Sequence, residues 1–416
     1  MSDLLSVDDA IAQILERFSP LPAEEVTLAT SLGRILANDI VAAENIPPFA
    51  NSSMDGFALR AEDIVLASEN NPIQLSLVMD IPAGKSPKKS IKAGQAARIM
   101  TGAAIPDGAN AVVPVESTDS AWSVGDRISL PGTIRVFRSL KQGDYVRPVG
   151  EDIRNGQKIL TAGAVIRPAE IGVMASLGCA HVPVTKQPRV AILSTGNELV
   201  SVSASLSPGK IRDSNSHALA ALVTTAGAIP IHVPRARDRL DDVRKCFRKA
   251  IALAPDMIIS SAGVSVGAFD VVRTVIDELG SVDFWRINLR PGKPLAFGQV
   301  GGIPFFGLPG NPVSAMVTFE VFVRPSLLKM AHRPDNSQVV TARLAEDLTS
   351  DGRRSYLRAK LLRENGEWIA HMTGTQSSGA LMSMVLADGL MIVPEDVHYL
   401  AAGSPVQVRL LRELPY

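Results

Sequence analysis

Residues Val190-Ala191-Ile192-Leu193-Ser194-Thr195-Gly196-Asn197-Glu198 decide the fold. The first four form a short apolar run, which favours a strand buried on both faces. The next five include hydroxyl residues and a glycine, and they end on a carboxylate. A buried strand followed directly by a polar loop is typical of a parallel sheet, where ligands bind beyond the carboxyl ends of the strands. The stretch therefore predicts a parallel α/β sheet with a site at this edge.

The same alternation continues outward over residues 185–331. Apolar runs typical of buried strands are separated by longer stretches typical of helices. The predicted strands lie at 190–193, 229–233, 257–260 and 304–307, and the predicted helices lie at 216–225, 240–253, 269–279 and 313–329. Strands and helices that alternate at this spacing predict a doubly wound α/β domain.

Two more of the predicted strands are followed by loops rich in small residues. Ser260 to Gly267 follows one strand and ends near Asp270, and Leu308 to Ala315 follows another. A cationic segment, Arg290-Pro291-Gly292-Lys293-Pro294, lies between these loops in the sequence. Because backbone N–H groups and helix N-termini gather at the carboxyl edge of such a sheet, these segments predict one pocket for a phosphate or an oxyanion.

Two further domains are predicted before residue 185. Residues 1–47 and 146–184 carry short helical patterns, at 6–18 and 168–177, and predict a small discontinuous linking domain. Residues 48–145 contain short apolar stretches punctuated by Gly, Pro and Asp. This pattern predicts a β-rich inserted domain.

Residues 332–416 follow the α/β domain and carry repeated strand patterns. These patterns lie at Val339 to Leu344, Tyr356 to Leu362, Trp368 to Met372, Leu390 to Val393 and Val406 to Leu411. We therefore expect a C-terminal β domain, and a multidomain chain of the α/β plus β class.

Composition excludes several functions. The 42 basic and 42 acidic side chains cancel, so no global field would attract nucleic acid or anionic lipid. No apolar segment is long enough to span a membrane, and the acidic N-terminus lacks a signal-peptide pattern, so a cytoplasmic protein is expected. Walker A and strand-linked GxGxxG motifs are missing from the sequence. P-loop NTPases and dinucleotide oxidoreductases are therefore disfavoured.

Three segments of the inserted region and its return supply a further set of carboxylate, hydroxyl and glycine residues. They are Asn51 to Ala58, Arg98 to Ala103 and Gly150 to Arg154. The two cysteines and six histidines of the chain show no spacing typical of a metal site. Carboxylates without a His or Cys cluster favour a hard cation such as Mg²⁺.

Taken in order, these motifs resemble one known family. They are Asn51-Ser52-Ser53-Met54-Asp55-Gly56, Met100-Thr101-Gly102-Ala103, Gly150-Glu151-Asp152-Ile153, Ser194-Thr195-Gly196-Asn197-Glu198-Leu199, Gly263-Val264-Ser265-Val266-Gly267, Pro291-Gly292-Lys293-Pro294 and Gly307-Leu308-Pro309-Gly310-Asn311-Pro312-Val313-Ser314. The set resembles the MoeA family of molybdopterin molybdenumtransferases, which includes the gephyrin E domain.

The resemblance implies a reaction and an assembly. Molybdate is inserted into the dithiolene of adenylylated molybdopterin, with Mg²⁺-dependent cleavage of the adenylate and release of AMP. The active site is implied to lie in a homodimer, between the molybdopterin-binding α/β domain of one subunit and the β-rich insert of the other. A molybdopterin adenylyltransferase and molybdoenzyme apoproteins are implied as partners, and neither nucleic acid nor a membrane is expected.

The resemblance also implies roles for individual residues. The catalytic set is Asp55, Thr101, Asp152, Glu198, Asp238 and Asp270, of which Asp55, Glu198, Asp238 and Asp270 would bind Mg²⁺. The residues expected to bind substrate are Ser194, Thr195, Gly196, Asp213, Gly263, Ser265, Arg290, Lys293, Pro309, Gly310, Asn311, Pro312 and Ser378.

Four positions depart from the commonest family pattern: Ala50 and Asn197 stand where Asp is usual, Ala262 where Gly is usual and Arg290 where Lys is usual. Two alternative functions stay open at this point. One is an enzyme that shares the α/β domain but acts on another nucleotide-like substrate, and the insert motifs disfavour it. The other is a non-enzymatic scaffold, which the full acidic set disfavours.

Overall fold

The computed structural model describes residues 4–120, 130, 132–261 and 269–414. The chain divides into two compact units, one formed by Met1–Glu25 with Pro183–Tyr416 and the other by Val26–Val182. Among the described residues, no helix is both long and apolar enough to cross a membrane.

The larger unit is built on a six-stranded sheet in the order β15-β12-β16-β20-β19-β17. Its first four strands run parallel, and the last two pair antiparallel at one edge. The strands are β12 (Arg189–Ser194), β15 (Ile229–His232), β16 (Met257–Ser261), β17 (Gly280–Arg286), β19 (Pro294–Val300) and β20 (Ile303–Leu308). The four parallel strands confirm the predicted α/β sheet, whereas β17 and β19 were not predicted.

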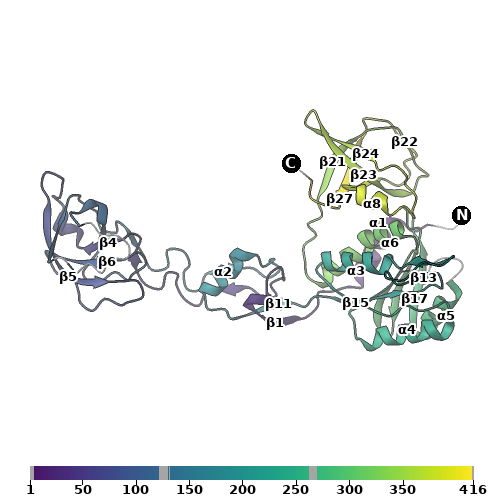
Figure 1. The fold of residues 1–416 in the computed structure, drawn as a ribbon, viewed down its shortest axis with the longest axis horizontal. Helices are drawn as coiled ribbons and strands as arrows, with labels where there is room; N and C mark the ends of the chain where they lie inside the picture. Colours follow the sequence, from purple (N-terminus) through teal and green to yellow (C-terminus); the bar gives the residue numbers. More distant parts are fainter. Residues whose placement is uncertain (1–3, 121–129, 131, 262–268, 415–416) are drawn as a thin grey trace. The chain divides into compact units, whose positions relative to one another are not determined.

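Helices cover both faces of this sheet (Figure 1). They are α1 (Val7–Glu16), α3 (Asn215–Thr225), α4 (Leu240–Ala252), α5 (Phe269–Leu279), α6 (Pro312–Thr318) and α7 (Arg324–Met330). Val190 and Ile192 of β12 belong to a core shared with α1, α3, α6 and α7, and Ala191 and Leu193 belong to one shared with α4 and α5. Successive strand residues point to opposite faces, so one apolar run serves both layers.

Two helical regions differ in detail from the sequence prediction. The helix expected at 313–329 is interrupted by a π-helical turn, Phe319–Val323, between α6 and α7. The helix expected at 6–18 was assigned to the linking domain, but Val7, Ala10 and Ile14 of α1 pack into the core of the larger unit. An amphipathic stripe shows that a helix has a buried face, but not which core receives it.

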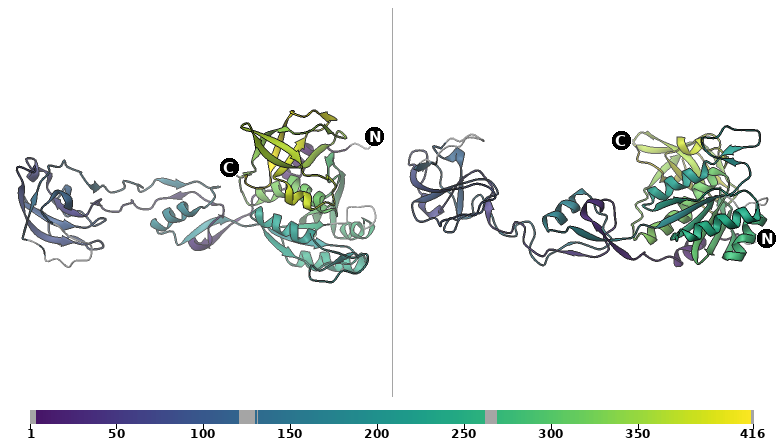
Figure 2. Two further views of the ribbon diagram at one scale, coloured as in Figure 1. Left: turned by 45° about the horizontal axis from the view of Figure 1, so that its top comes forward. Right: turned by 60° about the horizontal axis from the view of Figure 1, so that its bottom comes forward.

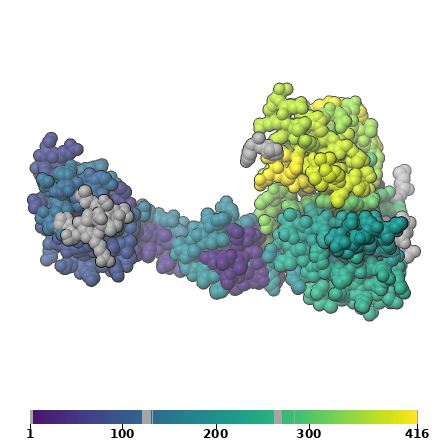
Figure 3. Space-filling view, viewed as in Figure 1, coloured from purple at the N-terminus to yellow at the C-terminus, as the bar shows by residue number. Residues whose placement is uncertain are grey.

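Residues 339–410, joined by β18 from the preceding region, form a second sheet in the same unit, in the order β18-β23-β24-β21-β27-β25 with an extra β23–β25 pairing that closes a barrel. Its strands are β18 (Leu289–Arg290), β21 (Val339–Leu344), β23 (Arg354–Glu364), β24 (Glu367–Met372), β25 (Gly389–Val393) and β27 (Pro405–Leu410). The larger unit also has shorter elements outside its two six-stranded sheets, namely β13 (Leu199–Val200), β14 (Ile211–Arg212), β22 (Leu348–Thr349), β26 (Tyr399–Leu400) and α8 (Met382–Leu386). The barrel (yellow in Figure 3) confirms the predicted β domain.

The smaller unit contains a five-stranded sheet in the order β7-β4-β6-β5-β8, drawn in blue in Figure 2. These strands are β4 (Gly56–Leu59), β5 (Ile73–Ile81), β6 (Gln95–Ile99), β7 (Ala111–Pro114) and β8 (Thr133–Val136). The other elements are β2 (Ile40–Val41), β3 (Asn51–Ser52), β9 (Val146–Arg147), β10 (Lys158–Leu160) and α2 (Pro168–Ser176). The β-rich character expected of residues 48–145 is confirmed. The predicted four-domain boundaries remain a prediction.

Two strands mark where the chain passes between the units. β1 (Ala23–Thr27) and β11 (His181–Thr185) pair with each other as a two-stranded sheet. On the side of the larger unit, the Lys186 N–H donates to the Pro22 carbonyl at 3.1 Å. The segment that leaves this unit and the segment that returns to it therefore lie side by side.

Candidate active site

The loop after β12 is tightly packed at the carboxyl edge of the sheet. Ser194 and Thr195 are buried, and Ser194 Oγ lies 3.1 Å from Ser261 Oγ at the end of the neighbouring strand β16. A Cβ at Gly196 would lie 2.6 Å from a carboxylate oxygen of Glu198. Only glycine therefore lets Glu198 fold back over the loop in this way.

A second loop lies directly beside the first. The Ala236 N–H donates to the Ser194 carbonyl at 3.0 Å, and the Asn197 N–H donates to Asp238 Oδ2 at 3.0 Å. The Asp238 N–H donates in return to Asn197 Oδ1 at 3.3 Å. These bonds bring the loops of Glu198 and Asp238 together, as expected for two members of one acidic set.

A third loop meets the barrel. Asn311 is the N-cap residue of α6, and Pro312 is the first residue of the helix. This position suits proline because the N–H that proline lacks would have no helical partner. Asn311 Nδ2 donates to Ser378 Oγ at 2.9 Å, and the Val313 N–H donates to the Ser378 carbonyl at 3.0 Å. The Pro309–Pro312 turn and Ser378, predicted as substrate-binding residues from distant parts of the sequence, are therefore in contact.

The start of α3 joins this turn. Asn215 Nδ2 donates to the Gly310 carbonyl at 2.7 Å. The buried carboxylate of Asp213 accepts a hydrogen bond from the Ser216 N–H at 3.1 Å. Asp213 thus helps to fix the first turn of α3, whose Asn215 contacts the predicted substrate-binding turn.

The two predicted cations lie at either side of a glycine turn. Arg290 Nη1 lies 3.6 Å from Asp351 Oδ2, and the Lys293 carbonyl accepts from the Ile287 N–H at 2.8 Å. Gly292 has φ +116° and a Cβ there would lie 2.5 Å from Thr318 Oγ1, so the turn requires glycine. A hydrogen bond from Arg353, with the charges of Arg353 and Arg290, lowers the pKa of Asp351.

Arg358 is a site residue that the sequence did not reveal. It is fully buried in β23, and its guanidinium donates to Ser383 Oγ at 3.1 Å and to the Ser377 carbonyl at 3.2 Å. Burial, and then the charge of Arg290, lower its pKa to about 10. It therefore holds the loop that carries Ser378. The signal that could have indicated this role is that Arg358 is a charged residue within a strand pattern otherwise typical of burial.

Four buried polar atoms in this region have no hydrogen-bond partner. They are Thr195 Oγ1, Asp238 Oδ1, Thr318 Oγ1 and Arg358 Nη1. Buried polar groups are normally bonded, and groups left without a partner often face a ligand or an ion. Asp238 Oδ1 is a carboxylate oxygen, the kind of ligand that a hard cation such as Mg²⁺ prefers.

Three predicted site residues of the larger unit follow β16 in the sequence. Asp270 is the second residue of α5. Gly263 and Ser265 lie outside the described residues, as does the unusual Ala262.

The smaller unit brings two of its predicted residues together. Asp55 Oδ1 accepts hydrogen bonds from the Thr101 N–H at 2.7 Å and from Thr101 Oγ1 at 2.8 Å. Asp152 is exposed after β9, and its N–H donates to the Ile46 carbonyl at 3.0 Å. None of the hydrogen bonds described for this unit links Asp152 to Asp55.

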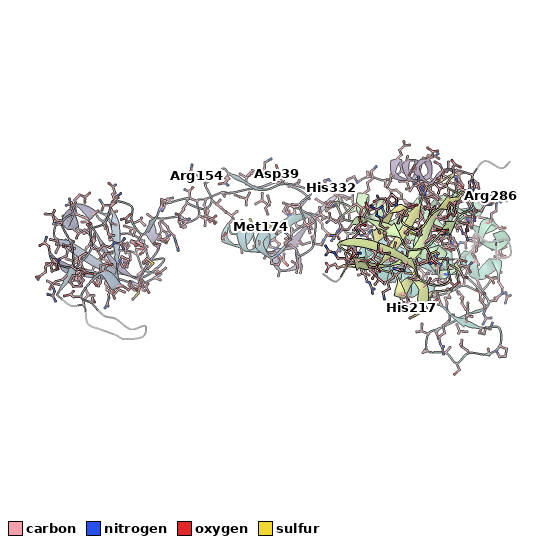
Figure 4. All side chains as sticks on the ribbon, turned by 90° about the horizontal axis from the view of Figure 1, so that it is seen from above. Asp39, Arg154, Met174, His217, Arg286 and His332 are labelled. Atoms are coloured by element: carbon pink, nitrogen blue, oxygen red, sulfur yellow. The ribbon has the colours of Figure 1, made fainter. Side chains whose placement is uncertain are left out.

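One contact between two histidines was not predicted from the sequence. The rings of His217, on α3 and labelled in Figure 4, and His232, at the end of β15, have centroids 5.6 Å apart. The two residues come from separate elements, so their spacing in the sequence gives no sign of the contact. Among the described residues, no group of three or more His, Cys, Asp or Glu side chains is placed to hold a metal.

Comparison with known proteins agrees with this architecture. Residues 5–178 match the MoeA N-terminal region (domain I and II), residues 191–329 match a probable molybdopterin binding domain, and residues 341–411 match the MoeA C-terminal region (domain IV). A Mycobacterium tuberculosis protein named molybdopterin molybdenumtransferase 2 is 38% identical, with 96% of each chain covered. The chain belongs to the MoeA family.

Other MoeA relatives support the same membership. The Bacillus subtilis molybdopterin molybdenumtransferase is 35% identical over 98% of this chain and 94% of that protein. A crystal structure of the MoeA protein from Pyrococcus horikoshii superposes with a TM-score of 0.83 at 33% identity, covering 99% of this chain and 100% of that one. The resemblance and the fold class predicted from the sequence are thereby confirmed.

Proposed function

We propose that this chain inserts molybdate into adenylylated molybdopterin and releases AMP. Two of the relatives described above are named molybdopterin molybdenumtransferase, and each aligns with nearly the whole chain. The observation that carries the proposal is the set of unpartnered buried atoms on Thr195, Asp238, Thr318 and Arg358. A site that combines hydroxyls, a carboxylate and a guanidinium suits a phosphate-bearing, metal-dependent substrate.

Anionic groups of the substrate are assigned to the cationic side of the site. Arg290 and Lys293 supply positive charge on a turn stiffened by Pro291 and Gly292. The Ser378 loop, held by Arg358, closes over the turn that begins α6. Arg290 would exchange its contact with Asp351 for an oxyanion, because a guanidinium donates to a compact anion through two parallel N–H groups.

Magnesium is assigned to the acidic side. Glu198, Asp238 and Asp270 would hold it together with Asp55, and the bound ion would neutralise charge on the phosphates during cleavage of the adenylate. Asp238 has a buried carboxylate oxygen with no protein partner, as expected of a metal ligand. The Asp238 loop is fixed by its bonds to Asn197 and Ser194, so the carboxylate is positioned before any ligand binds.

The smaller unit is assigned the other part of the site. Asp55, oriented by two hydrogen bonds from Thr101, and Asp152 would act on the adenylate from the insert of a second copy in a cytoplasmic homodimer. The nucleotide-activated substrate would come from a molybdopterin adenylyltransferase, and the product would pass to molybdoenzyme apoproteins.

The test is AMP release by the purified chain given adenylylated molybdopterin and Mg²⁺, with and without molybdate. Release that molybdate stimulates supports the proposal. A folded protein that releases no AMP under either condition contradicts it. Removing Mg²⁺ with a chelator should stop release and restoring Mg²⁺ should recover it, which separates the metal's role from that of the protein groups.

A further inference from the structure

A basic pocket is lined by residues of α4 and of the loop that carries Asp238. Its volume is about 530 Å³, and its charged lining comprises Arg235, Arg237, Arg239, Lys245, Lys249 and one carboxylate, Asp242. This volume lies within the range of about 300–1,000 Å³ that small-molecule sites occupy. The chain as a whole has no net charge, so five cations around one cavity are a local concentration of charge.

The loop that carries the three arginines has two different faces. Arg235, Arg237 and Arg239 are exposed. The residues between them turn the other way, since Ala236 is buried and Asp238 has a buried carboxylate oxygen. The loop bends at Asp238, where the Arg239 N–H donates to the Arg237 carbonyl at 2.7 Å, and the three arginine side chains are left at the surface.

The backbone of this loop is fixed without help from the arginine side chains. The Gly196 N–H donates to the Ala236 carbonyl at 3.2 Å, and the Cys246 thiol of α4 donates to the Pro234 carbonyl at 3.4 Å. Lys245 and Lys249, one turn apart on α4, line the pocket together with Cys246. The cations are therefore presented by a rigid frame.

The pocket cations differ from their neighbour Arg244. Arg244, on the same helix, is paired with Glu278 at 2.8 Å and with Asp241 at 2.9 Å. Within the described part of the chain, no carboxylate lies within ion-pair distance of any of the five pocket cations. The local structure neutralises Arg244 but leaves these five charges available to a ligand.

We propose that the basic pocket binds a compact anion that carries a diphosphate group, at a site separate from the predicted active site. Guanidinium groups bind phosphate oxygens through two parallel N–H donors, and ammonium groups add point charges. A single phosphate could contact only some of the five cations, whereas two linked phosphates present acceptors to both the loop and the helix. The inference does not depend on the proposed activity.

The test is titration calorimetry with inorganic pyrophosphate and, separately, with ADP. The variant is the double substitution Arg235→Gln/Lys249→Gln, which removes one charge from the loop and one from the helix. The control is Arg244→Gln, which removes a paired cation from the same helix. All three changed residues are solvent-accessible, and far-UV circular dichroism checks that each variant keeps the fold.

The expected result is one pyrophosphate bound per chain, at least about tenfold more weakly in the double variant and unchanged in the control. Tighter binding of ADP than of pyrophosphate would assign the diphosphate to a nucleotide. Equal binding by the wild type and the double variant would overturn the proposal, as would tighter binding of oligoglutamate than of pyrophosphate. The AMP-release assay on the same proteins reports separately on the proposed function.

Discussion

Individual side chains in the candidate site are oriented by hydrogen bonds that leave part of their chemistry free. Asp55 uses one carboxylate oxygen to accept both bonds from Thr101. Asp238 uses one oxygen to accept from Asn197, and its other oxygen is buried without a partner. In both cases the hydrogen bonds described go to one oxygen, which fixes the carboxylate.

Removing the charge of Asp55 should abolish turnover without disturbing its loop. Asp55→Asn keeps an oxygen that can accept from Thr101, so we expect a folded protein whose AMP release falls about a hundredfold or more. Glu198→Gln should behave in the same way. Thr101→Val is the matched control, since it removes the side-chain bond and keeps the charge, and it should lose less activity. Full turnover by Asp55→Asn would contradict the assigned role.

Arg358 should stabilise the barrel through its several donors as well as its charge. Arg358→Lys keeps a cation but cannot reach Ser383 Oγ and the carbonyls of Thr375 and Ser377 together. Unfolding in urea should show a loss of about 1–3 kcal/mol. Lys360→Arg, at an exposed position of the same strand, should change stability little. Equal midpoints for the wild type and Arg358→Lys would show that the bonds contribute nothing.

The sequence predicts some of these residues and not others, for a physical reason. Asp55, Thr101, Glu198 and Asp238 could be selected before their contacts were known because the resemblance to the MoeA family, which rests on short local motifs, implies their roles. Arg358 acts through a loop about 20 residues further along the chain, and its role depends on the pairing of β23 with its neighbours. A pattern within one segment does not record such a contact.

Secondary-structure elements show the same division between local and non-local information. The four parallel strands could be predicted because each is an apolar run in a repeating unit. The antiparallel pair β17 and β19 was missed, since the turn between them carries Arg290, Pro291, Gly292 and Lys293 and reads as a site segment rather than a hairpin. Closure of the barrel by β23 and β25 likewise depends on pairing between separate segments.

A glycine in β4 should be essential to the sheet of the smaller unit. A Cβ at Gly56 would lie 2.0 Å from the Val113 carbonyl oxygen on the paired strand β7. Backbone cannot yield to this contact cheaply, so Gly56→Ala should destabilise the unit by about 3 kcal/mol or more. Gly172→Ala, in α2 with open space around it, should instead stabilise the unit by about 0.5–1 kcal/mol. Thermal unfolding followed by circular dichroism would separate the two.

The π-helical turn carries a buried acid that should make stability depend on pH. Burial raises the pKa of Glu320, while Arg324 and Arg409 act in the opposite direction. Between its unfolded and folded pKa values, the folded protein holds a proton that the unfolded chain has lost, so stability falls as pH rises through this window. Glu320→Gln should remove that fall. Its unfolding free energy relative to the wild type should therefore increase with pH, as measured in urea, and a difference independent of pH would contradict this.

At the scale of the whole molecule, the two units have separate hydrophobic cores. Among the described residues, no hydrophobic cluster contains side chains from both units. Each unit should therefore unfold as its own cooperative system. Calorimetry should show at least two thermal transitions, and Gly56→Ala should lower only one of them. A single transition that moves as a whole in this variant would show that the units unfold together.

The pairing of Lys186 with Pro22 has a consequence for how such a chain can arise. The ends that the larger unit offers to residues 26–182 are hydrogen-bonded neighbours, so a turn of a few residues can join them. A gene that lost or gained the intervening segment would leave the connectivity of the α/β sheet and the barrel untouched. We therefore expect a shortened protein that lacks the smaller unit to keep the fold of the larger one.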